Sequence, residues 1–143
     1  MSSDEVIVHR YEVGEVVAEA TYSLDRESLV RYAGASGDFN SIHYRDDVAE
    51  SVGLPGVLAH GMLTMGLAVQ PVVEWLRDPT RVLDYQVKFT RPVVVDPVTG
   101  VAIGVRAVIG QLDEAAGTGR IDLTVTVDGT TVLGKAQVRV TLP

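Results

Sequence analysis

The stretch GMLTMGLAVQPVVEWL, residues 61–76, decides the fold. It carries no charged residue before Glu74, and its uncharged polar side chains, Thr64 and Gln70, do not form a polar face. A helix that is apolar on every side is buried on every side, and this stretch is too short to cross a membrane. Pro71 predicts a kink or an early break. We expect a core helix whose Met, Leu and Trp side chains serve only for packing.

The chain after Thr80 alternates apolar and polar side chains with the period of half-buried strands. Four segments share this pattern: residues 83–89, 101–109, 121–127 and 132–142. The dipeptide Asp128-Gly129 between the last two predicts a tight hairpin.

The first part of the chain predicts one strand and two short helices. Residues 16–20 are expected to form the strand. A hydrophobic staple around Asp25 predicts a helix that Gly34 ends, and a second helix is expected from Asp46 as its cap to Gly53 as its stop.

These elements predict an α+β fold, with a curved antiparallel sheet wrapped around the central apolar helix in a single domain, residues 1–143. Such a sheet has two edges, and the strand over residues 132–142 is expected at one of them. An edge strand can pair with a second chain, so we expect a dimer.

The composition narrows the classes of function. Of 143 residues, 12 are Lys or Arg and 19 are Asp or Glu, which gives a net charge of −7. This charge disfavours nucleic acid as a partner, because a phosphate backbone attracts the opposite sign. The lack of cysteine excludes disulfides, thiolate zinc sites and thiol nucleophiles. The acidic start MSSDEVIVHRYEVGE is unlike a signal peptide, so we expect a cytoplasmic protein without membrane insertion.

Reactive side chains are densest in the loop YAGASGDFNSIHYRDD, where Asp38, Asn40 and His43 fall close together. One reading is structural: the loop residues bond to their own backbone and the histidine is partly buried. The alternative interpretation is that these side chains transfer protons in acid-base catalysis. The loop does not match a calcium-binding loop, because the apolar Ile42 occupies a position where such a loop has a ligand. A zinc site that added His60 would lack the usual ligand spacing.

The tripeptide His60-Gly61-Met62 stands at the start of the apolar helix. The first N–H groups of a helix have no intrahelical partner, and glycine lets a ligand approach closely, so an oxyanion could bind here. Alternatively, the glycine only relieves crowding where the chain enters the helix.

Together the two motifs resemble those of the MaoC-like (R)-specific enoyl-CoA hydratases, the hydratase 2 family. The family loop (S/T)GDxNP(I/L)H is matched by SGDFNSIH at residues 36–43, and its HGM motif by residues 60–62. FTRPV at residues 89–93 resembles the family's strand motif. The likeness covers at least residues 22–96, and YAGASGD, AHGMLTMG and WLRDP resemble the (3R)-hydroxyacyl-ACP dehydratase subunits of this family.

The resemblance implies a hotdog fold and a lyase that hydrates trans-2-enoyl thioesters or dehydrates (3R)-hydroxyacyl thioesters. It implies Asp38 and His43 as the acid-base pair, Asn40 as support for the loop or the water, and the Gly61 N–H as oxyanion donor. Substrate contacts are expected from four further side chains: His60, Met62, Lys88 and Arg91. The expected partners are an acyl-CoA or acyl-carrier-protein thioester and a second hotdog subunit, identical or different. No cofactor or metal is expected.

Two positions depart from the family pattern. Ser41 replaces a proline, which loosens the loop without removing activity. Gly66 replaces a serine that bonds to the catalytic histidine in some members, so His43 needs another partner.

A hotdog thioesterase is disfavoured because residues 60–73 contain no acid. A non-catalytic acyl-binding subunit is disfavoured by the presence of both Asp38 and His43.

Overall fold

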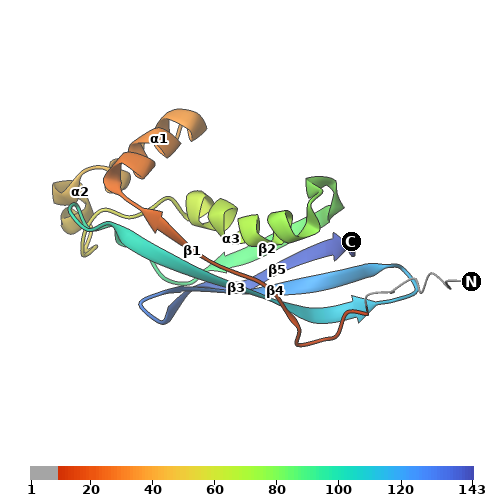
Figure 1. Ribbon diagram of the computed structural model, residues 1–143. Coiled ribbons are helices and arrows are strands. Elements are labelled where there is room, and N and C mark those ends of the chain that lie inside the picture. Colours follow the sequence, from red (N-terminus) through yellow and green to blue (C-terminus); the bar gives the residue numbers. More distant parts are fainter. Residues whose placement is uncertain (1–9) are drawn as a thin grey trace, which may run out of the picture.

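The computed structural model describes residues 10–143. Five strands form one antiparallel sheet in the order β1-β3-β4-β5-β2 (Figure 1). The strands are β1 (Val16–Leu24), β2 (Val82–Phe89), β3 (Val101–Asp113), β4 (Thr118–Val127) and β5 (Thr130–Thr141). The predicted α+β architecture with an antiparallel sheet is confirmed.

The hairpin between β4 and β5 forms where the sequence predicts it. Val127 pairs with Thr130, and the two residues between them, Asp128 and Gly129, have φ angles of 49° and 76°. Two consecutive positive φ angles are typical of the type I′ turn, whose twist matches that of the strands it joins.

The prediction that residues 132–142 form an edge strand is wrong. β5 lies between β4 and β2, with Tyr85 of β2 opposite Val138, and the sheet edges are β1 and β2. Alternation identifies the side chains that share a face, but it does not tell which strands are neighbours.

The two short helices begin and end slightly differently from the prediction. Helix α1 (Arg26–Ser36) is capped by Asp25, as predicted, but it continues through Gly34 and ends at Gly37, whose φ is 77°. Helix α2 (Asp46–Ser51) includes Asp46 as its first residue, so this side chain does not cap it.

The apolar helix α3 (Gly61–Leu76) passes through Pro71 without the predicted break and ends where Arg77 adopts a left-handed conformation, with φ of 59°. Proline removes one intrahelical hydrogen bond, and the turns on either side continue the helix here. None of the helices in the described part of the chain could span a membrane.

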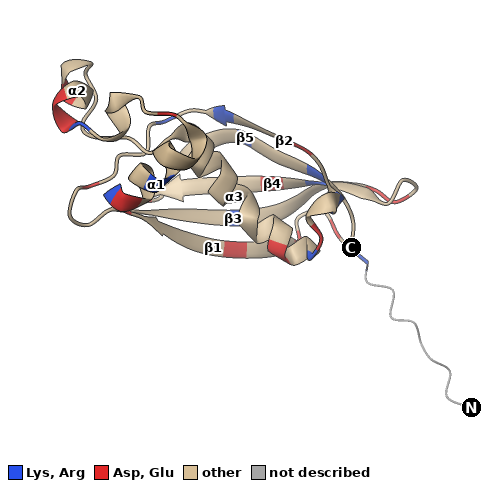
Figure 2. Cartoon of the chain, turned by 90° about the horizontal axis from the view of Figure 1, so that it is seen from above, with Lys and Arg blue, Asp and Glu red and all other residues tan. Residues whose placement is uncertain are grey.

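Helix α3 lies across one face of the sheet, on the same side as α1 and α2 (Figures 1 and 2). Its fully buried residues form one stripe: Thr64, Ala68, Pro71, Val72 and Leu76. The prediction that the helix is buried on every side is wrong for this chain, because Met62 is 59% exposed and Gly66 and Gln70 are also exposed. The sheet covers one side of α3, and the other side remains partly open.

Candidate active site

Asp38 and Asn40 hold the backbone of the loop that follows α1. Asp38 Oδ1 accepts a hydrogen bond from the Asn40 N–H at 3.1 Å, and Asn40 Oδ1 accepts one from the Ile42 N–H at 3.2 Å. Such bonds are typical of Asx turns. They use one oxygen of the Asp38 carboxylate, and the second oxygen, Oδ2, faces His43.

His43 ends the short 3-10 turn Ser41–His43 and donates a hydrogen bond through Nδ1 to the Leu58 carbonyl at 2.7 Å. A carbonyl only accepts, so in the neutral ring Nδ1 carries the proton and Nε2 a lone pair. Nε2 lies 3.9 Å from Asp38 Oδ2. The Leu58 carbonyl is therefore the partner that His43 finds in the absence of a serine at Gly66.

His60 packs against this pair and is only 1% exposed. Its Nε2 donates a hydrogen bond to the backbone carbonyl of Asp38 at 3.1 Å. Its ring stacks on His43, with centroids 3.8 Å apart and an angle of 20° between the planes, and Tyr32 of α1 contacts its edge. Burial lowers the pKa of His60 below its ordinary value of 6.5, so the ring is neutral at neutral pH.

Asp38, His43 and His60 lie close enough to resemble a metal site, because one ligand atom of each falls within 4.8 Å of the others. Their orientation suits a single ion poorly. The lone pair of an imidazole lies in the ring plane, so two nearly parallel stacked rings direct their lone pairs side by side rather than to a common point. That the site works without a metal stays a prediction.

The start of α3 presents the Gly61 N–H to the same region. The N–H groups of Leu63 and Thr64 donate to the His60 carbonyl, whereas the Gly61 N–H has no hydrogen-bond partner among residues 10–143. A Cβ atom on Gly61 would lie 2.9 Å from the ring of Phe89. Glycine thus allows the end of β2 to pack directly against the helix, and it leaves an amide accessible.

A cavity of about 280 Å³ opens beside His43 and Gly61. Most of its wall is apolar and comes from residues 58–59, residues 89–93 and Leu133. Thr64 also borders it, and the buried Oγ1 of this residue has no hydrogen-bond partner in the described part of the chain. A largely apolar hollow with a few unpaired polar groups is the usual form of a small-molecule site.

Three of the predicted site residues border this cavity: His43, Gly61 and Arg91. Asp38 lies against His43, and four residues do not border the cavity: Asn40, His60, Met62 and Lys88. Thr64 borders the cavity as well, although it is not among the residues predicted from the sequence. The sequence does contain a feature that singles out Thr64, because it has the only polar side chain in the first two turns of the apolar helix.

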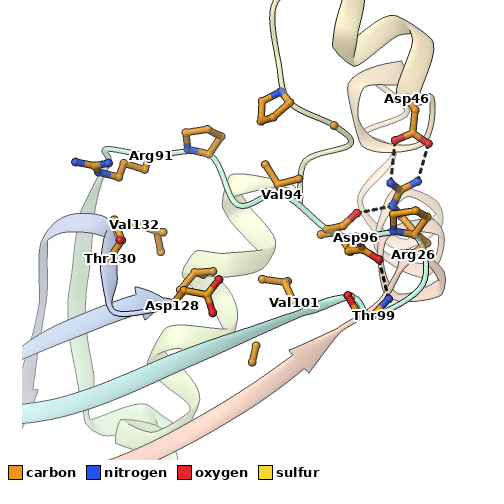
Figure 3. Close-up of a pocket in the computed structure, with 18 residues that line it drawn as sticks. Arg26, Asp46, Arg91, Val94, Asp96, Thr99, Val101, Asp128, Thr130 and Val132 are labelled. Carbon is orange, nitrogen blue, oxygen red and sulfur yellow. Dashed lines mark hydrogen bonds and ion pairs between the residues drawn. The ribbon is translucent and has the colours of Figure 1, made fainter.

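A second, larger cavity of about 740 Å³ is drawn in Figure 3. Arg26 donates from Nε to the Val95 carbonyl at 2.7 Å and from its two terminal nitrogens to the Asp46 carboxylate at 3.2 and 2.9 Å. Asp96 Oδ1 accepts two backbone N–H bonds at 2.8 Å from the loop that follows it. These charged groups bind one another and the backbone.

Comparison with known proteins places the chain in a family. The family model described as MaoC like domain matches residues 10–129. The 3-hydroxyacyl-thioester dehydratase X of Mycobacterium tuberculosis is 34% identical over 73 residues, which are 51% of this chain and 25% of that protein. A solved MaoC-like dehydratase is 36% identical with a TM-score of 0.90, and the match covers 93% of this chain and 41% of that one. The match thus spans about a quarter of the length of the M. tuberculosis protein and about two fifths of the length of the solved dehydratase chain.

Other solved structures share the fold. R-hydratase PhaJ1 from Pseudomonas aeruginosa is 27% identical with a TM-score of 0.77, and the match covers 93% of this chain and 83% of that one. The HadBC (3R-hydroxyacyl-ACP dehydratase) complex of M. tuberculosis contains a chain that is 18% identical, with a TM-score of 0.69 over 89% of this chain and 95% of that one, which shows a common fold alone. The fold is the hotdog fold, and the chain belongs to the MaoC-like domain family.

Proposed function

We propose that this chain catalyses the (R)-specific hydration of trans-2-enoyl thioesters, or the reverse dehydration of (3R)-hydroxyacyl thioesters. One observation carries the proposal: His43 Nε2 and Asp38 Oδ2 lie 3.9 Å apart, beside the cavity that Gly61 also borders. Two acceptors at this separation can each bind one hydrogen of the same water, whose oxygen then lies about 2.8 Å from both.

In the hydration direction, the water oxygen attacks C3 while Nε2 of His43 takes one of its protons. The Asp38 carboxylate accepts the other hydrogen and so orients the water. The electron pair of the C2–C3 double bond moves toward the thioester oxygen, where the Gly61 N–H stabilises the charge. The imidazolium then returns its proton to C2, which restores neutral His43 and completes the addition of one water.

The cavity holds only the reacting end of such a substrate, because about 280 Å³ is at the lower limit for ligand pockets. The rest of the thioester would extend past its rim, where Arg91 offers a positive charge and Lys88 lies nearby on β2. We propose that these two cations meet the phosphates of CoA or of the acyl-carrier-protein arm. Charge reversal at both should raise KM for CoA thioesters several-fold and leave a phosphate-free thioester nearly unaffected. Equal losses on both substrates would contradict this role.

We also propose that a second hotdog subunit covers the open side of this site. The β2 edge has no neighbouring strand within residues 10–143, and three large apolar side chains next to or among the site residues in the sequence are exposed: Phe39 at 63%, Met62 at 59% and Phe89 at 55%. A free edge and a group of exposed apolar side chains favour association. Light scattering of the purified chain tests this: an active homodimer supports an identical partner, an inert monomer supports a different one, and an active monomer contradicts the proposal.

The function is tested by a hydration assay of the purified chain on enoyl-CoA substrates of increasing length, with chiral analysis of the product. We expect (3R)-hydroxyacyl-CoA from the wild type. The His43→Ala variant should remain folded and lose at least about a hundredfold in turnover, as expected for a general base. A wild type without activity on any chain length, or a variant that keeps most of its activity, would refute the proposal.

We place the reaction in cytoplasmic fatty-acid metabolism, where CoA and carrier-protein thioesters are made and used.

No observation favours the thioesterase alternative. Helix α3 carries no carboxylate before Glu74, so the central helix offers no acidic side chain to this cavity. The same assay separates the two functions, because a thioesterase would release free CoA, which a thiol reagent detects.

A further inference from the structure

His60 contacts three parts of the proposed site although its side chain does not border the cavity. Its Nε2–H binds the carbonyl of Asp38, its ring face stacks on His43, and its own carbonyl accepts the first N–H bonds of α3, from Leu63 at 3.0 Å and Thr64 at 3.2 Å. One residue therefore links the loop, the base and the start of the helix that carries Gly61.

Resting on the proposed function, we propose that His60 is a positioning residue, whose ring fixes the plane of His43 and the backbone of Asp38 relative to the Gly61 amide. It touches neither the cavity nor a substrate that would occupy it. Its effect would be exerted through the two acid-base groups.

Packing alone does not require a histidine at this place. The Nδ1 atom of His60 is buried and has no partner in the described part of the chain. A phenylalanine would fill a similar space without this unsatisfied atom, but it could not donate to the Asp38 carbonyl. The imidazole combines a flat ring for His43 with a directed N–H for the loop.

The charge state of His60 also suits this role. The titratable groups in contact with it are the Asp38 carboxyl of the loop, His43 of the 3-10 turn and Tyr32 of α1. Burial has the largest effect and lowers the pKa of His60. The hydrogen bond to the Asp38 carbonyl opposes this shift, His43 lowers the pKa further, and the Asp38 carboxylate raises it by the smallest amount. A neutral ring does not repel the imidazolium that forms on His43 during the reaction.

Two variants separate the two contacts. His60→Gln keeps an N–H donor without the aromatic ring, and His60→Phe keeps the ring without the donor. We expect each to lower kcat on crotonyl-CoA by about tenfold or more, as is typical for residues that orient catalytic groups, with KM changed by less than about threefold. The control is Val72→Ala, which removes buried volume from the same helix away from the site and should reduce thermal stability while kcat of the folded protein is unchanged.

The histidine tautomers, read from ¹⁵N chemical shifts without substrate, decide the proposal independently of activity. In the wild type we expect Nδ1–H on His43 and Nε2–H on His60. His60→Gln removes the ring that keeps His43 aligned with the Leu58 carbonyl, so we expect a mixture of tautomers on His43, whereas His60→Phe keeps the ring and should keep the wild-type tautomer. An Nδ1–H tautomer on wild-type His60, or a single unchanged His43 tautomer in His60→Gln, would overturn the positioning role. If the wild type turns over no enoyl thioester, the proposed function fails, and the tautomers still test whether His60 fixes His43.

Discussion

The two cavities differ in size and in what their polar groups bind. At the larger one, of about 740 Å³, Arg26 binds the Asp46 carboxylate and the Val95 carbonyl, and Asp96 accepts two backbone N–H bonds. Arg91 borders both cavities. The smaller one, of about 280 Å³, is bordered by polar groups without close partners: His43 Nε2, Thr64 Oγ1 and the Gly61 N–H.

Under the proposed function, hydrogen-bonding capacity left for a ligand locates the chemistry better than cavity volume does. Donors and acceptors that already bind each other must be separated before they can act on a substrate. The unpaired groups of the smaller cavity need no such separation. We therefore expect substitutions at the smaller cavity to reduce mainly turnover, and equivalent substitutions at the larger cavity to reduce mainly stability.

The largest difference is expected between two aspartates with similar exposure, Asp38 at 50% and Asp46 at 52% of the side chain. Asp38→Asn should lower the rate of crotonyl-CoA hydration by at least about a hundredfold, because the amide cannot replace the carboxylate beside His43. Asp46→Asn makes the same change of charge at the larger cavity. It should leave kcat within about twofold and reduce the melting temperature slightly. Similar activity losses in both variants would contradict the functional contrast between the cavities.

Two glycines of α3 give the next comparison. Gly61→Ala places a Cβ atom 2.9 Å from the Phe89 ring, which must move, and Phe89 borders the smaller cavity. We expect turnover to fall by about tenfold or more, since a displaced oxyanion donor alone can cost more than that. Gly66→Ala, later in the same helix, meets nothing within 4 Å. It should raise the unfolding free energy by about 0.5–1 kcal/mol with unchanged activity. Equal kinetics for both variants would show that the Gly61 amide does not act on the substrate.

At the larger cavity the main effect should fall on stability. Arg26→Met removes the donor to the Val95 carbonyl and both bonds to Asp46, while the aliphatic part of the side chain is kept. Leaving the buried acceptor unpaired should lower the unfolding free energy by about 1–3 kcal/mol. Urea denaturation measures this loss, and kcat of the folded variant should match the wild type. A variant of normal stability and reduced turnover would assign this cavity a part in the reaction.

The same contrast explains how much of the molecule could be predicted from the sequence. Period-two segments, the Asp128-Gly129 hairpin and the apolar stretch 61–76 depend on local patterns, and the structure contains all three. The strand order depends on contacts far apart in the chain. β2 pairs with β5 across about fifty residues, which no local pattern of residues 132–142 could reveal.

The site also combines features that a local sequence pattern predicts with features that depend on distant contacts. The closeness of Asp38 and His43 follows from one loop and could be predicted from its spacing. The Leu58 carbonyl that fixes His43 is a backbone atom and carries no sequence signal. The burial of His60 could not be predicted either, because a histidine at a helix start faces solvent or protein depending on how the preceding loop folds over it.

The smallest effect is expected from pH and concerns His60. Its pKa in the folded protein is lowered, first by burial, below the ordinary value of 6.5 that it has in the unfolded chain. Below about pH 6.5 the unfolded state therefore binds more protons than the folded state, and the unfolding free energy falls as pH falls; above that pH this contribution does not change.

The difference between wild type and His60→Gln isolates this contribution. The carboxyls whose pKa is lowered by hydrogen bonds, such as those of Asp25 and Asp96, lose their stabilising effect only when pH falls below about 4, outside the window from pH 5 to 6.5. Urea denaturation across that window should show a shallower pH dependence for the variant. Identical slopes would mean that burial does not hold His60 neutral, and the charge state proposed for the ring stacked on His43 would lose its support.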